Sequence, residues 1–483
     1  MYLGIDLGTS SVKAALFDEA ERLVGQASRP LAVSRPAPGW SEQEPEDWWR
    51  AVEAAVDALA AAHGLGGLAG IGLSGQMHGA VALDHDDRPL RPAILWNDGR
   101  AGAECAEIEA AFPRAREVAG NIAMAGFTAP KLAWMRKREP RLFERIAHVL
   151  LPKDYVRLRL TGLHVSEMSD ASGTLWLDVG LRDWSDDLLE ATGLSRAQMP
   201  RLVEGSAASG ALRADLARRW GCGTVAVAGG AGDNAAAACG VGVVRPGTAF
   251  VSLGTSGVLF VSNAAFSPNT EGAVHAFCHA IPATWHQMGV ILSAADSLEW
   301  LARITGRSAQ ALAEGVGAPE RPSPVTFLPY LSGERTPHND PGARGAFVGL
   351  AQAHGAADLA QAVMEGVAFA FADCQAALAA AGTDFESALA VGGGSRSEAW
   401  LRIVASALDR PLRLAADSDL GAALGAARLA RCAAEGADPL EVCAAPETLR
   451  VIEPDPALVA AYREAHARYR ALYPALRSVG AGA

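Results

Sequence analysis

The chain has 483 residues, of which 50% are hydrophobic and 20% are charged. At this length we expect about two or three domains, and the hydrophobic content excludes a disordered chain. The net charge of −12, with no basic stripe, excludes nucleic acid as the main partner.

The N-terminus, two apolar stretches and the cysteines bear on the compartment of the protein. Residues 1–6 contain no basic region followed by an apolar stretch, so no signal peptide is expected. Asp233 interrupts the apolar residues 224–244 and Glu365 interrupts residues 362–372, so neither stretch predicts a membrane span. Seven scattered cysteines without a Cys-x-x-Cys pair favour free thiols over disulfides or a zinc cage. We therefore expect a cytoplasmic protein without a membrane partner.

The first predicted element is a hairpin near the start of the chain. Residues 2–7 and 11–17 are apolar runs separated by a Gly-Thr-Ser turn at residues 8–10. Such flanks around a glycine turn are typical of a tight β-hairpin. The backbone N–H groups and hydroxyls of the turn suit a bound phosphate, although an ordinary hairpin turn has the same sequence.

Helix and strand patterns alternate after the hairpin. Residues 45–62 predict an Ala-rich helix, and residues 69–74 predict a buried strand that ends in a glycine turn. Met77 and His78 follow that turn, at a place where loops of α/β folds meet ligands. Because a lone histidine is more often structural, position alone assigns no function to His78.

A second strand precedes the most informative carboxylate of the chain. Residues 224–230 predict a strand that leads into Asp233, at the start of an Ala-rich helix. A carboxylate among glycines can be approached closely by a substrate, which makes Asp233 a candidate general base. The same position also suits a helix N-cap, and the local sequence does not choose between the two.

The hairpin pattern recurs half a chain later. Residues 249–261 again combine an apolar run, a Leu-Gly-Thr-Ser turn and a second apolar run. Two copies indicate two related domains that open with the same hairpin, with a linker near residues 244–247. The chain contains no P-loop signature, so two matched turns are the better candidates for binding a nucleotide.

The two copies differ at two positions. Asp6 in the first copy corresponds to Ser252 in the second, and Lys13 corresponds to Leu259. A metal-binding carboxylate is therefore expected only on the first hairpin.

The last predicted elements surround a triple glycine. Residues 359–381 and 397–408 predict helices, and residues 389–391 predict a short strand that ends at residues 392–394. Glycines let a ligand approach the backbone closely, although a triple glycine can equally be a flexible loop. The alternation of strands and helices in both halves predicts an α/β fold.

An ordered set of longer motifs resembles the FGGY carbohydrate kinases, a branch of the sugar kinase, Hsp70 and actin superfamily. The resemblance runs from Met1 to about Leu472. Its motifs are GIDLGTS (4–10), GQMHG (75–79), LWNDGR (95–100), GFTAPKL (126–132), LPKDY (151–155), GDN (232–234) and YLSGERTPH (330–338).

The resemblance implies two ribonuclease-H-like, actin-like ATPase domains around a deep catalytic cleft. Residues 1–244 would form the sugar-binding domain with the catalytic base. Residues 245–483 would form the domain that mainly binds ATP.

The resemblance also implies the catalytic roles. It makes Asp233 the general base that takes the proton from the sugar hydroxyl, and it places Asp233 beside a metal. Asp6 resembles the residue that holds Mg²⁺, whereas the sequence alone also allows it to cap its own turn. Lys131 matches a family motif and is either catalytic or structural.

The remaining implied residues bind the two substrates. Met77, His78 and Asn234 would line the sugar site, and Trp96 and Asp98 are further candidates that could instead serve the core and a loop. The implied nucleotide-binding residues are Gly8, Thr9, Ser10, Lys13, Gly254, Thr255, Ser256, Gly392, Gly393 and Gly394; an exposed Lys13 could also be merely solvated.

The implied activity is ATP-dependent phosphorylation of D-xylulose to D-xylulose 5-phosphate, with Mg²⁺ aligning the phosphates. A sister kinase for ribulose, gluconate, glycerol or another polyol is the nearest alternative. An ATP-switched protein of the actin or Hsp70 kind is less favoured, because only a helical end and a tail at residues 478–483 follow the adenosine turn. Related kinases form dimers, so a homodimer is a further expectation.

Overall fold

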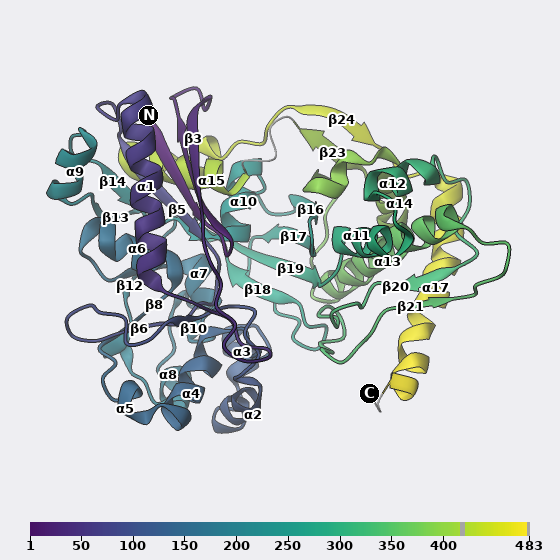
Figure 1. The fold of residues 1–483 in the computed structure, drawn as a ribbon, viewed down its shortest axis with the longest axis horizontal. Helices are drawn as coiled ribbons and strands as arrows, with labels where there is room; N and C mark the ends of the chain where they lie inside the picture. Colours follow the sequence, from purple (N-terminus) through teal and green to yellow (C-terminus); the bar gives the residue numbers. More distant parts are fainter. Residues whose placement is uncertain (416–420, 481–483) are drawn as a thin grey trace.

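Two seven-stranded sheets organise the protein, one in each half of the sequence (Figure 1). The computed structural model describes residues 1–415 and 421–480. The predicted second domain and tail also include residues 416–420 and 481–483, which lie outside this described part. Strands and helices alternate in both halves, which confirms the predicted α/β fold.

The first sheet is built by the N-terminal half. Its strands are β1 (Tyr2–Leu7), β2 (Ser11–Phe17), β3 (Leu23–Pro30), β5 (Gly70–Gly75), β13 (Ala208–Ala211), β14 (Ala226–Ala228) and β15 (Ala231–Gly232). Their order is β13-β14-β5-β1-β2-β3, with β15 paired to the end of β5. β1, β2 and β3 form antiparallel pairs, whereas β1, β14 and β15 each run parallel to β5.

The second sheet is built by the C-terminal half. Its strands are β16 (Ala249–Leu253), β17 (Gly257–Asn263), β18 (His275–Cys278), β19 (Trp285–Ile291), β22 (Ala388–Val391), β23 (Leu412–Ala415) and β24 (Thr448–Ile452). Their order is β18-β19-β17-β16-β22-β23-β24. β22 runs parallel to β16 and β23 runs parallel to β22.

The two sheets repeat one topology. Each has an antiparallel hairpin, β1-β2 or β16-β17, whose first strand pairs in parallel with a later strand, β5 or β22. This arrangement confirms that the sequence echo marks two related domains. The first turn, closed by Leu7 and Val12, spans residues 8–11, and the second, closed by Leu253 and Gly257, spans only residues 254–256.

The difference in turn length corrects one expectation. Asp6 pairs with Lys13 across the first hairpin, whereas Ser252 pairs with Val258 across the second. The predicted equivalence of Lys13 and Leu259 is therefore wrong, because the shorter turn shifts the register by one residue.

Helices cover both sheets, and separate two-stranded sheets lie outside them. The first half contains α1 (Pro45–His63), α2 (Gly102–Ala111), α3 (Ala115–Ala119), α4 (Thr128–Arg138), α5 (Pro140–Phe143), α6 (Pro152–Thr161), α7 (Met168–Ser172), α8 (Asp186–Thr192), α9 (Ala214–Trp220) and α10 (Asp233–Val241). The second half contains α11 (Ala295–Thr305), α12 (Ala309–Val316), α13 (Ala356–Ala380), α14 (Glu398–Leu408), α15 (Gly421–Glu435), α16 (Pro439–Val442) and α17 (Pro456–Gly480).

The minor elements are the 3-10 helices η1 (Arg196–Gln198) and η2 (Gly393–Arg396), and the strand pairs β4 (Glu42–Gln43) with β7 (Ala93–Ile94), β6 (Val81–Leu83) with β8 (His148–Leu150), β9 (Val165–Glu167) with β12 (Arg201–Val203), β10 (Leu177–Asp178) with β11 (Asp183–Trp184), and β20 (Thr326–Leu328) with β21 (Ala346–Val348).

One predicted strand is broken in the structure. Within residues 224–230 only Ala226–Ala228 form a strand, β14, and pairing with β5 resumes at β15, instead of continuing as one strand. Gly230, between these strands, has a φ of 72°, and a Cβ there would lie 2.2 Å from the Leu73 carbonyl oxygen. The close approach of this left-handed glycine to β5 interrupts the strand.

Helix α13 and the cysteines bear on the expected compartment. By length and composition, α13 is the one helix in the described residues that could cross a membrane, but 83% of its most apolar stretch is buried inside the protein. Its Glu365 accepts hydrogen bonds from the Ser323 N–H and the Tyr462 hydroxyl, as suits a core helix of the second domain. The seven cysteines are free thiols.

Helix α15 comes from the second half of the sequence but packs on the first domain. Although it lies in the sequence between β23 and β24 of the second sheet, it packs against β1, β5 and α10 of the first domain (Figure 1). Glycines make this contact possible, since a Cβ at Gly4 or Gly72 would lie within 2 Å of a carbonyl oxygen of α15. The second sheet begins at Ala249, a few residues after the boundary expected at 244/245, and α15 packs on the first domain.

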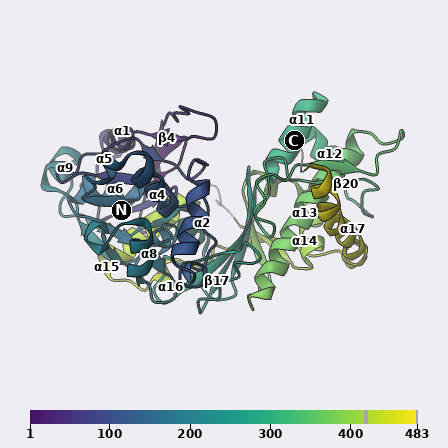
Figure 2. The ribbon, with the colours of Figure 1, turned by 90° about the horizontal axis from the view of Figure 1, so that it is seen from below.

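The edge of the second sheet joins the two domains. The side chain of Asn121 donates to the Ala276 carbonyl at 3.0 Å, and the Cys278 N–H donates to the Ser172 hydroxyl at 3.0 Å. Helices α13, α14 and α17 lie on the side of the second domain away from the first (Figure 2). Strand β18 therefore contacts the first domain directly through hydrogen bonds.

Candidate active site

The carboxyl ends of three parallel strands meet at one place. Asp6 of β1 and Ala231 of β15 are both register partners of Ser74 in β5, one on each side. Asp233 follows β15 directly and is the first residue of α10. Two carboxylates that are far apart in the sequence are thus brought to the same sheet edge, where α/β folds bind ligands.

Asp233 has the electrostatics of a base poised near neutral pH. Burial, and to a lesser extent the charge of Asp6, raise its pKa to about 6 against the hydrogen bonds from Asn234, which lower the pKa. Its Oδ1 accepts from the Asn234 N–H at 2.7 Å and from the Asn234 side-chain amide at 3.0 Å. The N-cap of α10 is Gly232, so the N-cap interpretation of Asp233 is wrong.

Asp6 is half-buried beside a cation and a hydroxyl. The Ser74 hydroxyl donates to its Oδ1 at 2.9 Å, and Lys13 is its partner across the hairpin. Burial raises the pKa of Asp6, while the bond from Ser74 and the charge of Lys13 lower it. The side chain thus bonds to a neighbouring strand and not to its own turn.

Met77 and His78 lie beside the strand that delivers Asp233. A Cβ added at Gly232 would lie 2.9 Å from the Met77 sulfur, so this glycine makes room for Met77. His78 has a φ of 69°, a left-handed conformation that only a fixed turn maintains in a bulky residue. Both predicted sugar-site residues are therefore held in defined places.

The His78 ring has a defined protonation state. Its Nδ1 lies 2.6 Å from the Gly173 carbonyl oxygen, so Nδ1 carries the proton and Nε2 offers a lone pair. Burial lowers the pKa of His78 to about 3; the bond to Gly173 raises it, and the charges of Lys131 and Arg335 lower it. The ring is neutral at physiological pH, and its Nε2 can accept a hydrogen bond from a hydroxyl group.

Lys131 fixes the backbone of this turn. Its Nζ donates to the carbonyl oxygens of His78 and Gly126 at 2.8 and 2.7 Å, and the Thr128 hydroxyl donates to the same His78 oxygen at 3.1 Å. Burial holds the pKa of Lys131 well below its usual range. Of the two roles left open by the sequence, the contacts support positioning of the His78 turn.

The first phosphate turn belongs to a chain of hydrogen bonds. The Trp96 Nε1 donates to the Thr9 hydroxyl at 3.0 Å, and this hydroxyl donates to Gln76 Oε1 at 3.0 Å. Gln43 closes the network by accepting from Gln76 and donating to the Thr9 carbonyl. Trp96 is 41% exposed, so its interpretation as a core residue is wrong.

Asp98 is engaged within the protein. Its carboxylate accepts from the Ser41 N–H at 2.6 Å and forms an ion pair with Arg100 at 2.7 Å. Arg100 in turn stacks 3.5 Å above the Trp40 ring. These contacts suit a residue that shapes the loop after Trp96, and contact with a sugar remains a prediction.

Ser10 and Lys13, on the same hairpin as Asp6, form no side-chain hydrogen bond or ion pair with other described residues. Ser10 is exposed, and its carbonyl oxygen accepts from the Leu31 N–H at 2.8 Å. The Gly8 N–H donates to the Ser11 carbonyl within the turn. Lys13 is half-buried opposite Asp6, so it is more than a solvated surface lysine.

The second turn and the triple glycine lie together in the second domain. A Cβ at Gly392, where φ is 87°, would lie 2.9 Å from the Leu253 carbonyl carbon, just before Gly254. The carbonyls of Gly254 and Thr255 accept from the first N–H groups of α11, while Thr255 and Ser256 are themselves exposed. Gly392 and Gly394 therefore pack closely against Leu253, whereas Gly393 between them is exposed.

A cavity of about 780 Å³ opens beside these glycines. It lies between α11, α12, η2 and α14, and its lining includes Gly393, Gly394, Ala313 and Trp400. The volume and the mixture of apolar surface with backbone polar groups suit a nucleoside.

A buried cluster of charged side chains lies beside Gly232, the residue before Asp233. Lys153 Nζ lies 2.7 Å from Asp154, 3.3 Å from Glu167 and 3.1 Å from Asp170. Burial alone would lower the pKa of Lys153, but these carboxylates raise it. The Ser169 hydroxyl, bonded to Glu167, accepts from the Gly232 N–H at 3.1 Å and so anchors the residue before Asp233.

Arg335 lies in the YLSGERTPH motif (330–338), which by itself gives this residue no role. Its Nη1 lies 3.2 Å from Nε2 of His275, whose Nδ1 lies 2.9 Å from Asn121 of the first domain. Its charge reaches His78. No carboxylate in the described part of the chain forms an ion pair with it. The motif signalled importance, but only the fold brings Arg335 to His78.

The chain is similar to known carbohydrate kinases along most of its length. Residues 1–240 match the model for the FGGY family of carbohydrate kinases, N-terminal domain, and residues 249–434 match that for the C-terminal domain. The chain is 50% identical over 479 residues to the xylulose kinase of Escherichia coli (strain K12), with 99% of each chain covered.

Two solved structures of kinases are similar to this chain along 99% of its length. The chain is 58% identical to a kinase from Brucella ovis named "xyloylose kinase", with a TM-score of 0.96 and 99% of each chain covered. It is 31% identical to a xylulose kinase from Rhodospirillum rubrum, with a TM-score of 0.91 and the same coverage.

Proposed function

The chain belongs to the FGGY family of carbohydrate kinases, and from that premise we propose that it transfers the γ-phosphoryl group of ATP to D-xylulose. The products are D-xylulose 5-phosphate and ADP. The observation that carries the proposal is Asp233, a carboxylate with its pKa raised to about 6 beside Met77 and His78. The relatives at 50% and 58% identity carry the name of the same substrate.

Asp233 serves as the general base. Its ionised carboxylate accepts the proton of the sugar 5-hydroxyl as the oxygen forms a bond to the γ-phosphorus, and the bond from that phosphorus to the β-γ bridging oxygen breaks. The phosphoryl group moves through a loose transition state, so correct position matters more than strong basicity. The bonds from Asn234 to Oδ1 fix this position.

Asp6 and Asp233 would hold Mg²⁺. Both are half-buried carboxylates with raised pKa values, and the charge of one raises the pKa of the other. Such an excess of negative charge fits a hard divalent cation with oxygen ligands. When bound, Mg²⁺ neutralises charge on the phosphates. Lys13 adds a positive charge beside Asp6.

The sugar contacts follow from the neutral His78. Its Nε2 accepts a hydrogen bond from a sugar hydroxyl, Met77 packs against the carbon face, and Asn234 offers an amide beside the base. We add Arg335 as a donor from the second domain, because its charge lowers the pKa of His78 and it forms no ion pair among the described residues. Trp96 and Asp98 shape the neighbouring loop.

The nucleotide would lie between the two phosphate turns and the cavity. Residues 8–10 and 254–256 offer backbone N–H groups to the phosphates. Residues 392–394 offer a backbone surface to the adenosine, beside the 780 Å³ cavity. Closure of the domains around both substrates would keep water from the γ-phosphate.

Two other functions are less well supported. A sister kinase for ribulose, gluconate or glycerol would use the same phosphate-binding residues, but the relatives at highest identity are named for xylulose. An ATP-switched protein without catalysis would not need Asp233 beside Asp6. A cytoplasmic location, a homodimer and the absence of nucleic-acid and membrane partners stay predictions.

The test is ADP release coupled to a colorimetric enzyme assay with D-xylulose, D-ribulose, L-ribulose, gluconate and glycerol at equal concentrations. We expect D-xylulose to give the highest kcat/KM. A higher value for another compound would keep the kinase assignment and overturn the substrate.

A further inference from the structure

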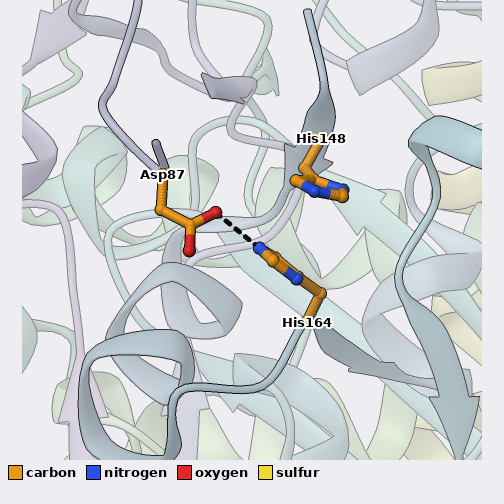
Figure 3. Close-up of side chains that lie close together, drawn as sticks. All are labelled: Asp87, His148 and His164. Atoms are coloured by element: carbon orange, nitrogen blue, oxygen red, sulfur yellow. Dashed lines mark hydrogen bonds and ion pairs between the residues drawn. The ribbon is translucent and has the colours of Figure 1, made fainter. Parts of the chain in front are cut away.

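Three metal-ligating side chains meet on the first domain, on segments that the kinase reaction does not use. Asp87 lies in the turn after β6, His148 begins β8 and His164 precedes β9 (Figure 3). One ligand atom of each lies within 4.8 Å of the others. We propose that these residues bind a divalent transition-metal ion of the Zn²⁺ class, which ties the three segments together.

The donor set selects the kind of ion. Two imidazoles and one carboxylate are the ligands of Zn²⁺, Ni²⁺ or Cu²⁺, whereas Mg²⁺ prefers oxygen ligands alone. Three protein ligands leave a fourth position for water. The site therefore differs in chemistry from the carboxylate pair Asp6 and Asp233.

The backbone holds the ligands near one another. His148 is the register partner of Leu83 in the β6-β8 pair, and Asp87 follows four residues later in a tight turn. That turn is closed by the Arg88 N–H, which donates to Asp84 Oδ1 at 3.0 Å. His164 then reaches the same place from the end of α6. Because three separate segments converge, a bound ion would cross-link them.

The metal-free side chains already interact. Nε2 of His164 lies 2.7 Å from Oδ1 of Asp87, and the His148 and His164 rings stack at 3.9 Å with an interplanar angle of 24° (Figure 3). Stacked rings do not aim their lone pairs at one point, so binding requires a ring to turn. Asp87 is exposed and the two histidines are half-buried, which leaves room for this turn and an entry path for the ion.

The other ends of the same strands reach the active site. β6 begins shortly after His78, and β9 ends at Glu167 of the buried charge cluster. The metal would therefore stabilise the part of the domain that supports the sugar site, without contacting substrate.

The experiment uses the full chain after dialysis against a chelator. Binding of Co²⁺ and Zn²⁺ is followed by the visible spectrum of Co²⁺ and by calorimetry, and Tm is measured with and without Zn²⁺. The variants are His148→Asn with His164→Asn, and Asp87→Asn, with the exposed His63→Asn as matched control. A background of Asp6→Asn removes binding at the catalytic carboxylates.

We expect one ion per chain, a rise in Tm with Zn²⁺, and binding more than about tenfold weaker in the double histidine variant. His63→Asn should bind like the unchanged chain. Equal binding by the double variant and the unchanged chain would overturn the proposal, as would absence of binding at 100-fold excess metal. If the double variant misfolds by circular dichroism, Asp87→Asn decides by the same criterion.

Discussion

Asp6 and the strand that delivers Asp233 flank the same residue, Ser74, on opposite sides of β5. This shared register is the reason that two carboxylates from distant parts of the sequence influence each other, and the charge of Asp6 contributes to the raised pKa of Asp233. Strand pairing thus brings Asp6 and Asp233 to the same edge of the sheet.

The raised pKa predicts the acid limb of the pH profile. Because the base acts only when ionised, kcat/KM for the sugar should fall tenfold per pH unit below the Asp233 pKa of about 6. The measurement is the initial rate from pH 4.5 to 8 with D-xylulose and Mg-ATP both well below their KM values, so that the profile reports the free enzyme, in which Asp233 binds no Mg²⁺. A profile that stays flat down to pH 4.5 would mean that Asp233 has an ordinary pKa or is not the base.

The same burial predicts that Asp233→Asn stabilises the free protein. The folded pKa of about 6 lies above the ordinary aspartate value of 3.8, so the folded state binds more protons between these two pH values and stability falls as the pH rises from one to the other. The cost of the ionised form, about 1–3 kcal/mol, is complete above pH 6 and absent below 3.8.

Urea unfolding of both chains at pH 7.5 and pH 4.5 measures this effect. We expect Asp233→Asn to be the more stable at pH 7.5, with a smaller difference at pH 4.5. A variant that is less stable at pH 7.5 would contradict the assignment of burial as the main cause.

Lys131 is predicted to be a positioning residue for the sugar site. Lys131→Met removes the two bonds to the carbonyls of His78 and Gly126, so the left-handed His78 turn loses its support. We expect the KM for D-xylulose to rise about tenfold or more while the KM for ATP changes little. The control is Lys137→Met, an exposed lysine of the same helix. Equal effects on both KM values would indicate a general structural role instead.

The triple glycine offers a matched pair of substitutions. A Cβ at Gly393 meets no protein atom within 4 Å, whereas a Cβ at Gly392 would clash with Leu253 in a left-handed backbone. Gly393→Ala should therefore leave the Tm unchanged but weaken ATP binding by about 1–3 kcal/mol if adenosine covers this backbone. Gly392→Ala should lower the Tm as well. Unchanged ATP affinity in folded Gly393→Ala would remove this glycine from the nucleotide site.

The packing of α15 predicts a stability effect far from the chemistry. A Cβ at Gly72 would lie 1.8 Å from the Ala426 carbonyl oxygen, so Gly72→Ala should destabilise the protein by about 1–3 kcal/mol. Gly66→Ala, where the Gly221 carbonyl oxygen would lie 3.8 Å from the new Cβ, is the control. Differential scanning calorimetry compares them, and equal Tm values would show that α15 can shift at little cost.

Local features of the fold were predictable from the sequence. The repeated hairpin, the start of the helix at Asp233 and the helix from residue 45 each depend on neighbouring residues, and the structure contains all of them. The split of residues 224–230 was missed, because it depends on the contact of Gly230 with Leu73 in another strand.

The parts that were not predictable depend on contacts between distant segments. The packing of α15 on β1 and β5, and the approach of Arg335 to His78, follow from the arrangement of the two domains. Sequence motifs identified Lys131, but its bonds to two backbone carbonyls became visible only in the folded chain. The roles of the site residues themselves stay predictions until the variants are measured.

The most direct test of the account is the turnover of D-xylulose by Asp233→Asn with ATP and Mg²⁺, alongside calorimetric binding of each substrate. If Asp233 is the general base, kcat should fall by about 10²–10⁴-fold while both ligands still bind to a folded protein. A variant that binds both and keeps more than about a tenth of the turnover would contradict this role.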